Sequence, residues 1–229
     1  NMDRIAEAIG DRPIPIVEDA AQALGSKFRS QSAGSFGAAG TFSFYPAKVL
    51  GCFGDGGAVV TNDPDVANRI SLLRDHGRNE DGDVVAWGTN CRLDNLQAAI
   101  LDFKLKTFDV DVARRREIAL RYDAGLSALN EVRLPPSPHA DERHYDVYQN
   151  YEIECDRRDA LQAHLRNAGI GTFIQFGGKP VHQYPLGFDD LRLPYTENLY
   201  SRMLLLPMHT AMTDEDVDYT IAQVRAFYA

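Results

Sequence analysis

Residues 13–19 read Pro-Ile-Pro-Ile-Val-Glu-Asp, and this stretch decides the fold. The short apolar run over 13–17 is typical of a strand buried on both faces. A helical pattern over 2–10 precedes it and ends on Gly10, a residue type that commonly terminates helices. A helix, a short loop and a buried strand in this order predict an α/β fold. Asp19 ends the strand, at the edge where open α/β sheets bind ligands.

Two further strands are predicted downstream, over 41–44 and 58–61. Between them lie Lys48 and a glycine-rich loop over 51–57. The loop lacks the Lys-Ser/Thr pair that follows the glycines of a nucleotide-triphosphate loop. It also leads into a strand, whereas a dinucleotide-binding loop opens a helix. The two common phosphate-binding loops are therefore disfavoured.

The second half of the chain changes in character. Helical patterning dominates 92–129, with a bend expected over 107–112, and a proline-rich break follows at 135–138. After the break, the patterns predict a strand over 147–153, a helix over 156–168, strands over 171–176 and 203–206, and a helix over 214–227. An α/β region is therefore followed by a smaller α+β unit.

The composition is that of an ordinary globular protein. The chain has 229 residues, 44% of them apolar and 25% charged, with 24 Lys+Arg against 33 Asp+Glu and a net charge of −9. These proportions exclude a disordered or collagen-like chain. The acidic balance argues against nucleic acid as a partner, but a few local groups can still hold a small anion.

The cysteines and the hydropathy pattern exclude further classes. Three cysteines occur without a Cys-x-x-Cys pair, so we expect no metal site, no disulfide framework and a reduced, cytoplasmic setting. No apolar run approaches the roughly 18 residues that a membrane helix needs, so no membrane partner is expected.

Three residues between 19 and 48 could carry chemistry together. Lys48 lies among apolar neighbours, an environment that lowers the pKa of an amine and makes it a usable nucleophile. Asp19 offers a carboxylate and Ser43 a hydroxyl. A Schiff-base lysine, a carboxylate for a pyridinium nitrogen and donors for a phosphate are what pyridoxal phosphate requires. The pattern alone leaves open a solvated surface lysine and a helix-capping aspartate.

Longer motifs resemble the DegT-type sugar-nucleotide aminotransferases, and the resemblance runs over essentially the whole chain. They are VEDAAQALG at 17–25, FSFYPAK at 42–48, GDGGAVVT at 54–61, RDHG at 74–77 and GTNCRLDNLQAAI at 88–100. The resemblance implies the pyridoxal-phosphate-dependent type I aminotransferase fold. Residues 1–110 are then the remaining part of an incomplete large mixed-sheet α/β domain, and 111–229 a linking helix and a small α+β C-terminal domain.

The resemblance also implies roles for individual residues. Lys48 forms the Schiff base with pyridoxal 5'-phosphate and moves the proton between cofactor and substrate. Asp19 pairs with the pyridinium nitrogen, Gln22 reaches the phenolic oxygen, and Ser43 hydrogen-bonds the phosphate. Asn90 resembles the residue that reaches the phosphate of the neighbouring subunit, so a homodimer with shared active sites is expected.

Other positions are matched less directly. Lys179 and His182 are candidate substrate contacts, with an ordinary loop as the equal alternative. Tyr45 is a further candidate for the substrate side, at a place where other family members often have His. For His76 and Arg92 we favour a core histidine and a surface ion pair over catalytic roles.

The C-terminal motifs narrow the resemblance to one branch of the family. Residues 146–151, 169–172, 174–183 and 204–210 look like the branch that acts on 3-keto-6-deoxyhexose nucleotides. We therefore expect a ping-pong transamination from glutamate to a dTDP-linked 3-keto-6-deoxyhexose, for antibiotic or polysaccharide biosynthesis. A perosamine-type 4-aminotransferase and a non-catalytic binding module stay open. A 3-dehydratase of the same family would have His in place of Lys48.

The resemblance also bears on the length of the chain. Family members have a preceding segment with a loop that holds the phosphate and an aromatic residue that stacks on the ring. We therefore expect Asn1 to follow such a segment in a larger enzyme. We also expect the isolated chain to have weak or no transaminase activity.

Overall fold

The computed structural model describes residues 1–188 and 190–229. It divides into two compact units. The first contains Asn1–Val112 and Asp141–Gln149, and the second contains Ala113–Ala140 and Asn150–Ala229. The expected domains, 1–110 and 111–229, do not include this return of 141–149 to the first unit, and as domains they stay a prediction.

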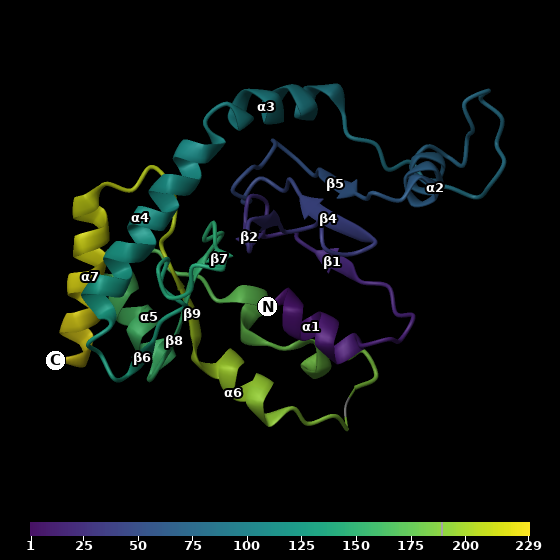
Figure 1. Cartoon of the computed structure of the whole chain (residues 1–229). Helices are drawn as coiled ribbons and strands as arrows, with labels where there is room; N and C mark the ends of the chain where they lie inside the picture. The colour runs from purple at the N-terminus through teal and green to yellow at the C-terminus, as the bar shows by residue number, and fades with distance from the viewer. Residues whose placement is uncertain (189) are drawn as a thin grey trace. The chain divides into compact units, whose positions relative to one another are not determined.

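A three-stranded sheet organises the first unit (Figure 1). Its order is β1 (Val17–Asp19), β4 (Ala39–Ser43) and β5 (Gly57–Val60), with β4 in the centre. The strands predicted over 41–44 and 58–61 are confirmed as β4 and β5. β1 starts later than predicted and is an edge strand of this sheet, and Val17 is 65% exposed. The expectation of a strand buried on both faces is therefore wrong for β1.

Very short strands form a second sheet in the first unit. β2 (Lys27–Phe28) pairs with β3 (Gln31–Ser32) and with β7 (His144–Tyr145), antiparallel in both cases. The ring of Phe28 also lies 4.9 Å from that of His144. This pairing ties segment 141–149 to the first unit.

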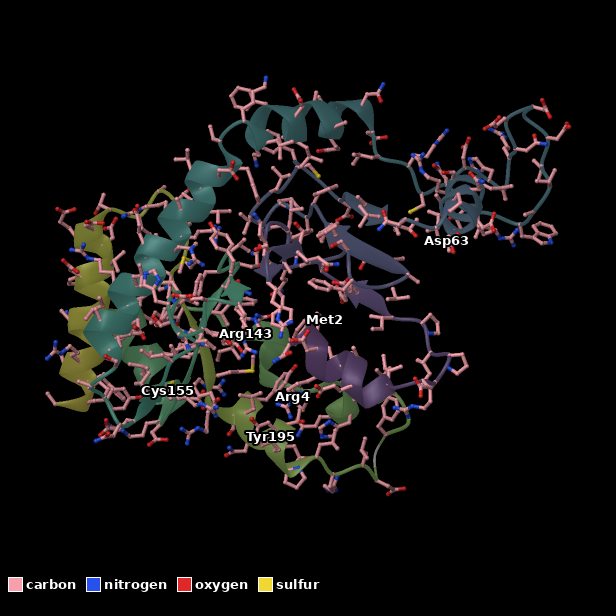
Figure 2. All side chains as sticks on the ribbon, in the orientation of Figure 1. Met2, Arg4, Asp63, Arg143, Cys155 and Tyr195 are labelled. Carbon is pink, nitrogen blue, oxygen red and sulfur yellow. The ribbon has the colours of Figure 1, made fainter. Side chains whose placement is uncertain are left out.

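The helices of the first unit follow the sequence closely. α1 (Met2–Ile9) ends at Gly10, which has a positive φ of 57°. α2 (Pro64–Arg74) begins at Asp63, whose carboxylate accepts from the N–H groups of Asp65 and Val66 at 2.9 and 3.3 Å (Figure 2). α3 (Asn95–Leu105) and α4 (Phe108–Leu126) confirm the long helical region and its bend. Only the first turn of α4 belongs to the first unit, because the second unit begins at Ala113.

The second unit is built on an antiparallel sheet ordered β6 (Val132–Arg133), β8 (Tyr151–Cys155) and β9 (Met203–Leu206). Its helices are α5 (Arg158–Asn167), α6 (Pro194–Arg202) and α7 (Asp214–Tyr228). A core of buried side chains joins the sheet to α4, α5 and α7: Ile118, Tyr122, Leu126, Ile153, Leu161, Leu165, Leu204, Val217 and Val224.

One predicted strand of this unit is wrong. Over 171–176 only Phe173 forms a β-bridge, to Leu205, and a 3-10 helix follows over Gln175–Gly178. Phe176 and Gly177 have positive φ angles of 51° and 61°, which no strand can include. The segment therefore turns away after a single bridge.

Cys52, Cys91 and Cys155 are free thiols, and Cys155 ends β8 (Figure 2). Within 1–188 and 190–229, no helix has both the length and the apolar character needed to cross a membrane.

Candidate active site

Asp19 and Ser43 end two neighbouring strands of the first sheet. β1 and β4 run parallel, and Asp19 lies beside Thr41 in the register. Because side chains alternate along a strand, Thr41 and Ser43 project from the same face, and Asp19 shares it. The carboxylate and the hydroxyl therefore lie at one edge of the sheet, on one face.

Both side chains keep hydrogen-bonding capacity in reserve. Asp19 accepts from the Ala21 N–H through Oδ1 at 3.1 Å, and Oδ2 has no partner in the part of the chain described. Ser43 Oγ accepts from the Tyr45 N–H at 3.2 Å, and its own hydrogen has no acceptor among the described residues. The Asp19 carboxylate can therefore accept a further hydrogen bond, and the Ser43 hydroxyl can donate one.

Lys48 lies in the turn that leaves β4. Its N–H donates to the Tyr45 carbonyl at 2.8 Å, which closes the turn. The residue is half-buried, and the following Leu50 and Cys52 are buried with Leu101 of α3 in a small apolar core. Across the described residues, Lys48 Nζ has neither an ion pair nor a hydrogen bond. The chain therefore enters this core directly after Lys48, and no carboxylate of the described chain neutralises the Lys48 amine.

The glycine loop after Lys48 is packed too tightly for larger residues. A Cβ at Gly51 would lie 2.6 Å from the Pro46 carbonyl oxygen and 2.7 Å from that of Tyr45. The chain therefore folds back directly over the lysine turn. The loop then returns to the sheet, where the Phe44 N–H donates to the Gly56 carbonyl at 2.7 Å.

Gln22 and Asn90 lie in different surroundings. Gln22 is exposed in the turn that follows Asp19. Asn90 is also exposed and forms a β-bridge with Asp75, and its Oδ1 accepts from Arg92 Nε at 3.1 Å. The contacts described for Asn90 thus do not include the residues around Lys48, and its predicted role lies in a neighbouring subunit.

The predictions for Arg92 and His76 have different outcomes. Arg92 forms an ion pair with Asp75 at 3.3 Å, with side chains 49% and 36% exposed, so the predicted surface ion pair is confirmed. His76 is exposed and has a positive φ of 60° in the turn after α2. The expected core histidine is therefore wrong, because the backbone turns at this position and does not enter the core.

The predicted substrate residues belong to both units. Tyr45 is 53% exposed in the first unit, beside the lysine turn. In the second unit Lys179 is exposed, whereas His182 is buried and its Nε2 lies 2.9 Å from Glu197 Oε1. His182 Nδ1 is buried without a hydrogen-bond partner in the described structure. The roles of these three side chains stay predictions.

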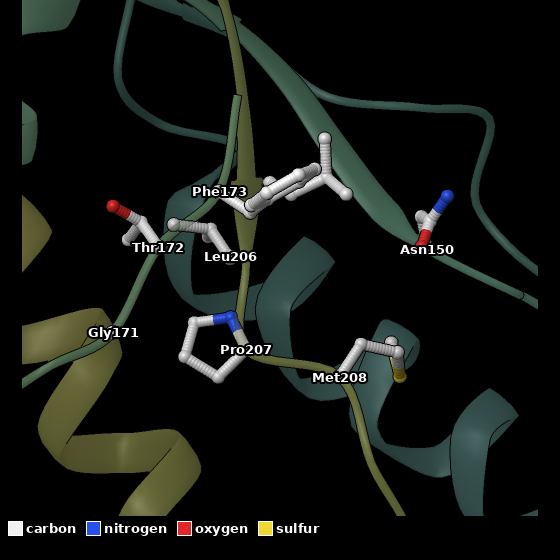
Figure 3. A pocket seen from close by; sticks show the side chains of 8 residues that line it. Asn150, Gly171, Thr172, Phe173, Leu206, Pro207 and Met208 are labelled. Atoms are coloured by element: carbon white, nitrogen blue, oxygen red, sulfur yellow. The ribbon is translucent and has the colours of Figure 1, made fainter. Parts of the chain in front are cut away.

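The second unit contains an open hollow of about 330 Å³ (Figure 3). Its lining combines polar side chains with an aromatic ring: Asn150, Gly171, Thr172, Phe173, Leu205, Leu206, Pro207 and Met208. Lys179 and His182 are not part of this lining. All of these residues except Phe173 lie in 146–151, 169–172 and 204–210, three of the four segments that suggested the family branch in the sequence.

Three supporting residues were missed in the sequence. The Glu18 carboxylate accepts from the N–H groups of Gly34, Phe36 and Gly37. Lys104 Nζ donates to the carbonyl of Gly51, at the start of the glycine loop. The Gln149 side chain forms hydrogen bonds with the backbone of Ala47 and Val49, on the two sides of Lys48. Such side-chain contacts to distant backbone have no sequence signature. Only the position of Glu18 beside Asp19 could have drawn attention to it.

Comparisons with known proteins identify the family. The family described as DegT/DnrJ/EryC1/StrS aminotransferase matches residues 1–225. The erythromycin biosynthesis sensory transduction protein EryC1 of Saccharopolyspora erythraea is 41% identical over 96% of this chain and 60% of its own length. The dTDP-3-amino-3,4,6-trideoxy-alpha-D-glucose transaminase of Streptomyces venezuelae is 38% identical over 91% of this chain and 55% of its own.

The structural likeness agrees. A DegT DnrJ EryC1 StrS aminotransferase from Brucella abortus superposes with a TM-score of 0.91 at 36% identity, over 100% of this chain and 61% of that chain. These findings confirm the predicted resemblance and the pyridoxal-phosphate-dependent aminotransferase fold. The chain spans between half and two thirds of the length of these relatives.

Proposed function

Because the chain belongs to the DegT/DnrJ/EryC1/StrS aminotransferase family, we propose that its protein is a sugar-nucleotide aminotransferase of the cytoplasm. The observation that carries the proposal is local. Asp19 and Ser43 end adjacent parallel strands on one face, and Lys48 follows in a turn with an unpaired amine among the described residues. Aminotransferases of this family depend on pyridoxal phosphate.

The chemistry of these three side chains fits that cofactor. A pyridinium N–H needs an acceptor, and Asp19 Oδ2 has capacity for one. A phosphate needs donors, and the Ser43 hydroxyl still has its hydrogen to donate. An aldehyde needs a free amine, and no carboxylate of the described chain pairs with Lys48. When bound, pyridoxal phosphate supplies an electron sink for the charge that develops on the substrate carbon.

The residues of this chain then have distinct tasks. Asp19 keeps the ring nitrogen protonated and fixes one end of the ring. Ser43 would fix the phosphate end, and Gln22, which is exposed in the turn after Asp19, is proposed to bind the phenolic oxygen. The Lys48 amine holds the cofactor, then takes a proton from one carbon and returns it to the other as general base and acid. The half-buried position of Lys48 limits competing water.

The favoured substrates are glutamate and a dTDP-linked 3-keto-6-deoxyhexose, and the product is an amino sugar for an antibiotic or a polysaccharide. Support comes from the Streptomyces venezuelae relative, a dTDP-3-amino-3,4,6-trideoxy-alpha-D-glucose transaminase. Tyr45, Lys179 and His182 are the proposed substrate contacts. Asn90 is proposed to reach the phosphate of a partner subunit, so the active unit is a homodimer with shared sites.

The proposal is tested in the intact protein that contains this chain. Purified protein is incubated with pyridoxal phosphate, glutamate and either the 3-keto or the 4-keto dTDP-6-deoxyhexose, and products are identified by mass spectrometry and NMR. We expect amination at C3. We expect Lys48→Ala to lower turnover roughly 10³-fold or more, since general base catalysis and covalent attachment are both lost. Lys106→Ala is the control, because that side chain is 68% exposed on the surface.

The outcomes separate the levels of the proposal. Amination at C4 would show that the 4-keto sugar is the substrate, and the proposal of a sugar-nucleotide aminotransferase would stand. Binding of the keto sugar without amination by the intact protein would favour a non-catalytic module. Full turnover by Lys48→Ala would overturn the assigned mechanism.

A further inference from the structure

We infer that Gln149 is a positioning residue that fixes the backbone of Lys48 and thereby the reach of its amine. The inference rests on the proposed function of Lys48. The Val49 N–H donates to Gln149 Oε1 at 2.8 Å, and Gln149 Nε2 donates to the Ala47 carbonyl at 2.8 Å. One side-chain amide therefore pairs with the main chain immediately before and immediately after the lysine.

These two hydrogen bonds, which we call the Gln149 bracket, restrict the backbone conformation of Lys48. The two hydrogen bonds hold the peptide groups on both sides of Lys48, and the Lys48 N–H is held in turn by the Tyr45 carbonyl at 2.8 Å. The lysine side chain is long and flexible, so the position of its amine depends on where the backbone is held. A fixed starting point raises the effective concentration of the amine at its target.

Gln149 is itself held in place by its neighbours. Val147 is fully buried and Tyr148 is 3% exposed. Asp146 Oδ1 accepts from the Tyr148 N–H at 2.9 Å. Tyr148 has a positive φ of 51°, an uncommon conformation for a bulky residue, and such strain persists only where the surrounding structure imposes it. The backbone conformation that presents Gln149 is therefore maintained at a cost.

Close packing of the neighbouring Val147 explains how the strained conformation of Tyr148 is maintained. At Gly25, which has a φ of +86°, a Cβ would lie 3.3 Å from Val147 and 2.9 Å from the Phe108 ring. Val147 thus packs closely against the backbone of Gly25, where there is no room for a side chain. The segment that ends in Gln149 is anchored in the first unit independently of the bracket.

Two variants of Gln149 and one control test the inference in the intact protein. Gln149→Met has a similar size and makes neither hydrogen bond. Gln149→Glu keeps an acceptor for the Val49 N–H and loses the donor to Ala47. Gln31→Met is the control, since Gln31 Nε2 donates to the Ser35 carbonyl at 2.9 Å, away from the lysine turn.

The first measurement needs no cofactor. Amide hydrogen exchange at Val49 is followed by NMR or mass spectrometry. We expect Gln149→Met to speed exchange at Val49 roughly tenfold, as loss of one hydrogen bond predicts. Gln149→Glu should restore protection at Val49, and Gln31→Met should leave it unchanged.

The second measurement follows the amine. Protein is saturated with pyridoxal phosphate and reduced with borohydride, and the fraction of bound cofactor attached to Lys48 is determined by peptide mapping. Total bound cofactor is measured separately after denaturation. We expect the attached fraction to fall several-fold in Gln149→Met and to stay at the wild-type level in Gln31→Met. If Gln149→Met does not fold, Gln149→Glu serves for this comparison, with a smaller fall.

The failures are distinguishable. An attached fraction in Gln149→Met equal to that of the wild type, or an equal loss in Gln31→Met, overturns the inference and leaves the proposed function intact. A wild-type protein that binds no cofactor on Lys48 overturns the proposed function, and the inference with it.

Discussion

Lys104 Nζ donates to the Gly51 carbonyl at 2.6 Å and so joins α3 to the loop that follows Lys48. The same ammonium group lies 5.3 Å from the centre of the Phe53 ring. From α3 the Gln97 side chain also accepts from the Phe53 N–H at 2.8 Å. A helix far along the chain therefore holds the loop next to the proposed catalytic lysine.

The first prediction concerns this contact. Lys104→Met keeps the aliphatic part of the side chain and removes the charged donor from a partly buried carbonyl. We expect a loss of about 1.5–3 kcal/mol in the free energy of unfolding, the range for hydrogen bonds to charged groups. Urea unfolding measures it. Lys106→Met is the matched control. The Lys106 side chain is 68% exposed, and its Nζ forms a surface ion pair with Asp102 Oδ2 at 3.7 Å. Equal losses in both variants would contradict the role of the Gly51 contact.

The second prediction concerns Glu18, next to Asp19. Its two oxygens accept from the N–H groups of Gly34, Phe36 and Gly37. Glu18→Gln replaces one oxygen with a donor that faces an N–H, so an amide is left without an acceptor. We expect a loss of about 2–3 kcal/mol in the free energy of unfolding. Glu80→Gln, on the exposed surface, should change it by less than about 0.5 kcal/mol. An unchanged midpoint in Glu18→Gln would refute this assignment.

The third prediction concerns pH. Hydrogen bonds from His182 and from the Leu193 N–H hold the pKa of Glu197 below its ordinary value of 4.5. Because folding favours the charged carboxylate, its contribution to stability is complete above that value and is lost as pH falls through the folded pKa. The difference in unfolding free energy between wild type and Glu197→Gln should therefore be largest near neutral pH and shrink below pH 4.5. A difference that does not vary with pH would argue against it.

The fourth prediction uses the cysteines. Burial raises the pKa of Cys155 to about 11, whereas Cys91 is exposed. At pH 8 only about 10⁻³ of a thiol with that pKa is thiolate, the reactive form. Iodoacetamide on the native protein should label Cys91 and spare Cys155, as peptide mapping can show. In urea all three cysteines should react. Native labelling of Cys155 at the rate of Cys91 would contradict the buried position.

Much of the fold could be predicted from local pattern. β5 and β9 contain short apolar runs, and α2 begins at a capping aspartate followed by proline. Two-residue strands such as Lys27–Phe28 are too short for an alternation to be visible. The helix Pro194–Arg202 was missed as well, because its N-cap, Leu193, has no capping side chain.

The candidate site also contains residues that could be predicted from the sequence and residues that could not. Asp19, Ser43 and Lys48 could be grouped from sequence because strand ends and a following turn are local features. Gln149 could not, because its partners lie about a hundred positions away and are main-chain atoms. Residue type alone predicts a core position for His76, whereas the left-handed turn at this position exposes the residue.

The central claim is that Lys48 is the residue that binds pyridoxal phosphate covalently. The most direct measurement is borohydride reduction of the intact protein after saturation with the cofactor, followed by peptide mapping. We predict one phosphopyridoxyl group, on Lys48, and its complete loss in Lys48→Ala. Labelling of another lysine such as Lys27 or Lys104 in its place, or labelling undiminished in Lys48→Ala, would contradict the claim.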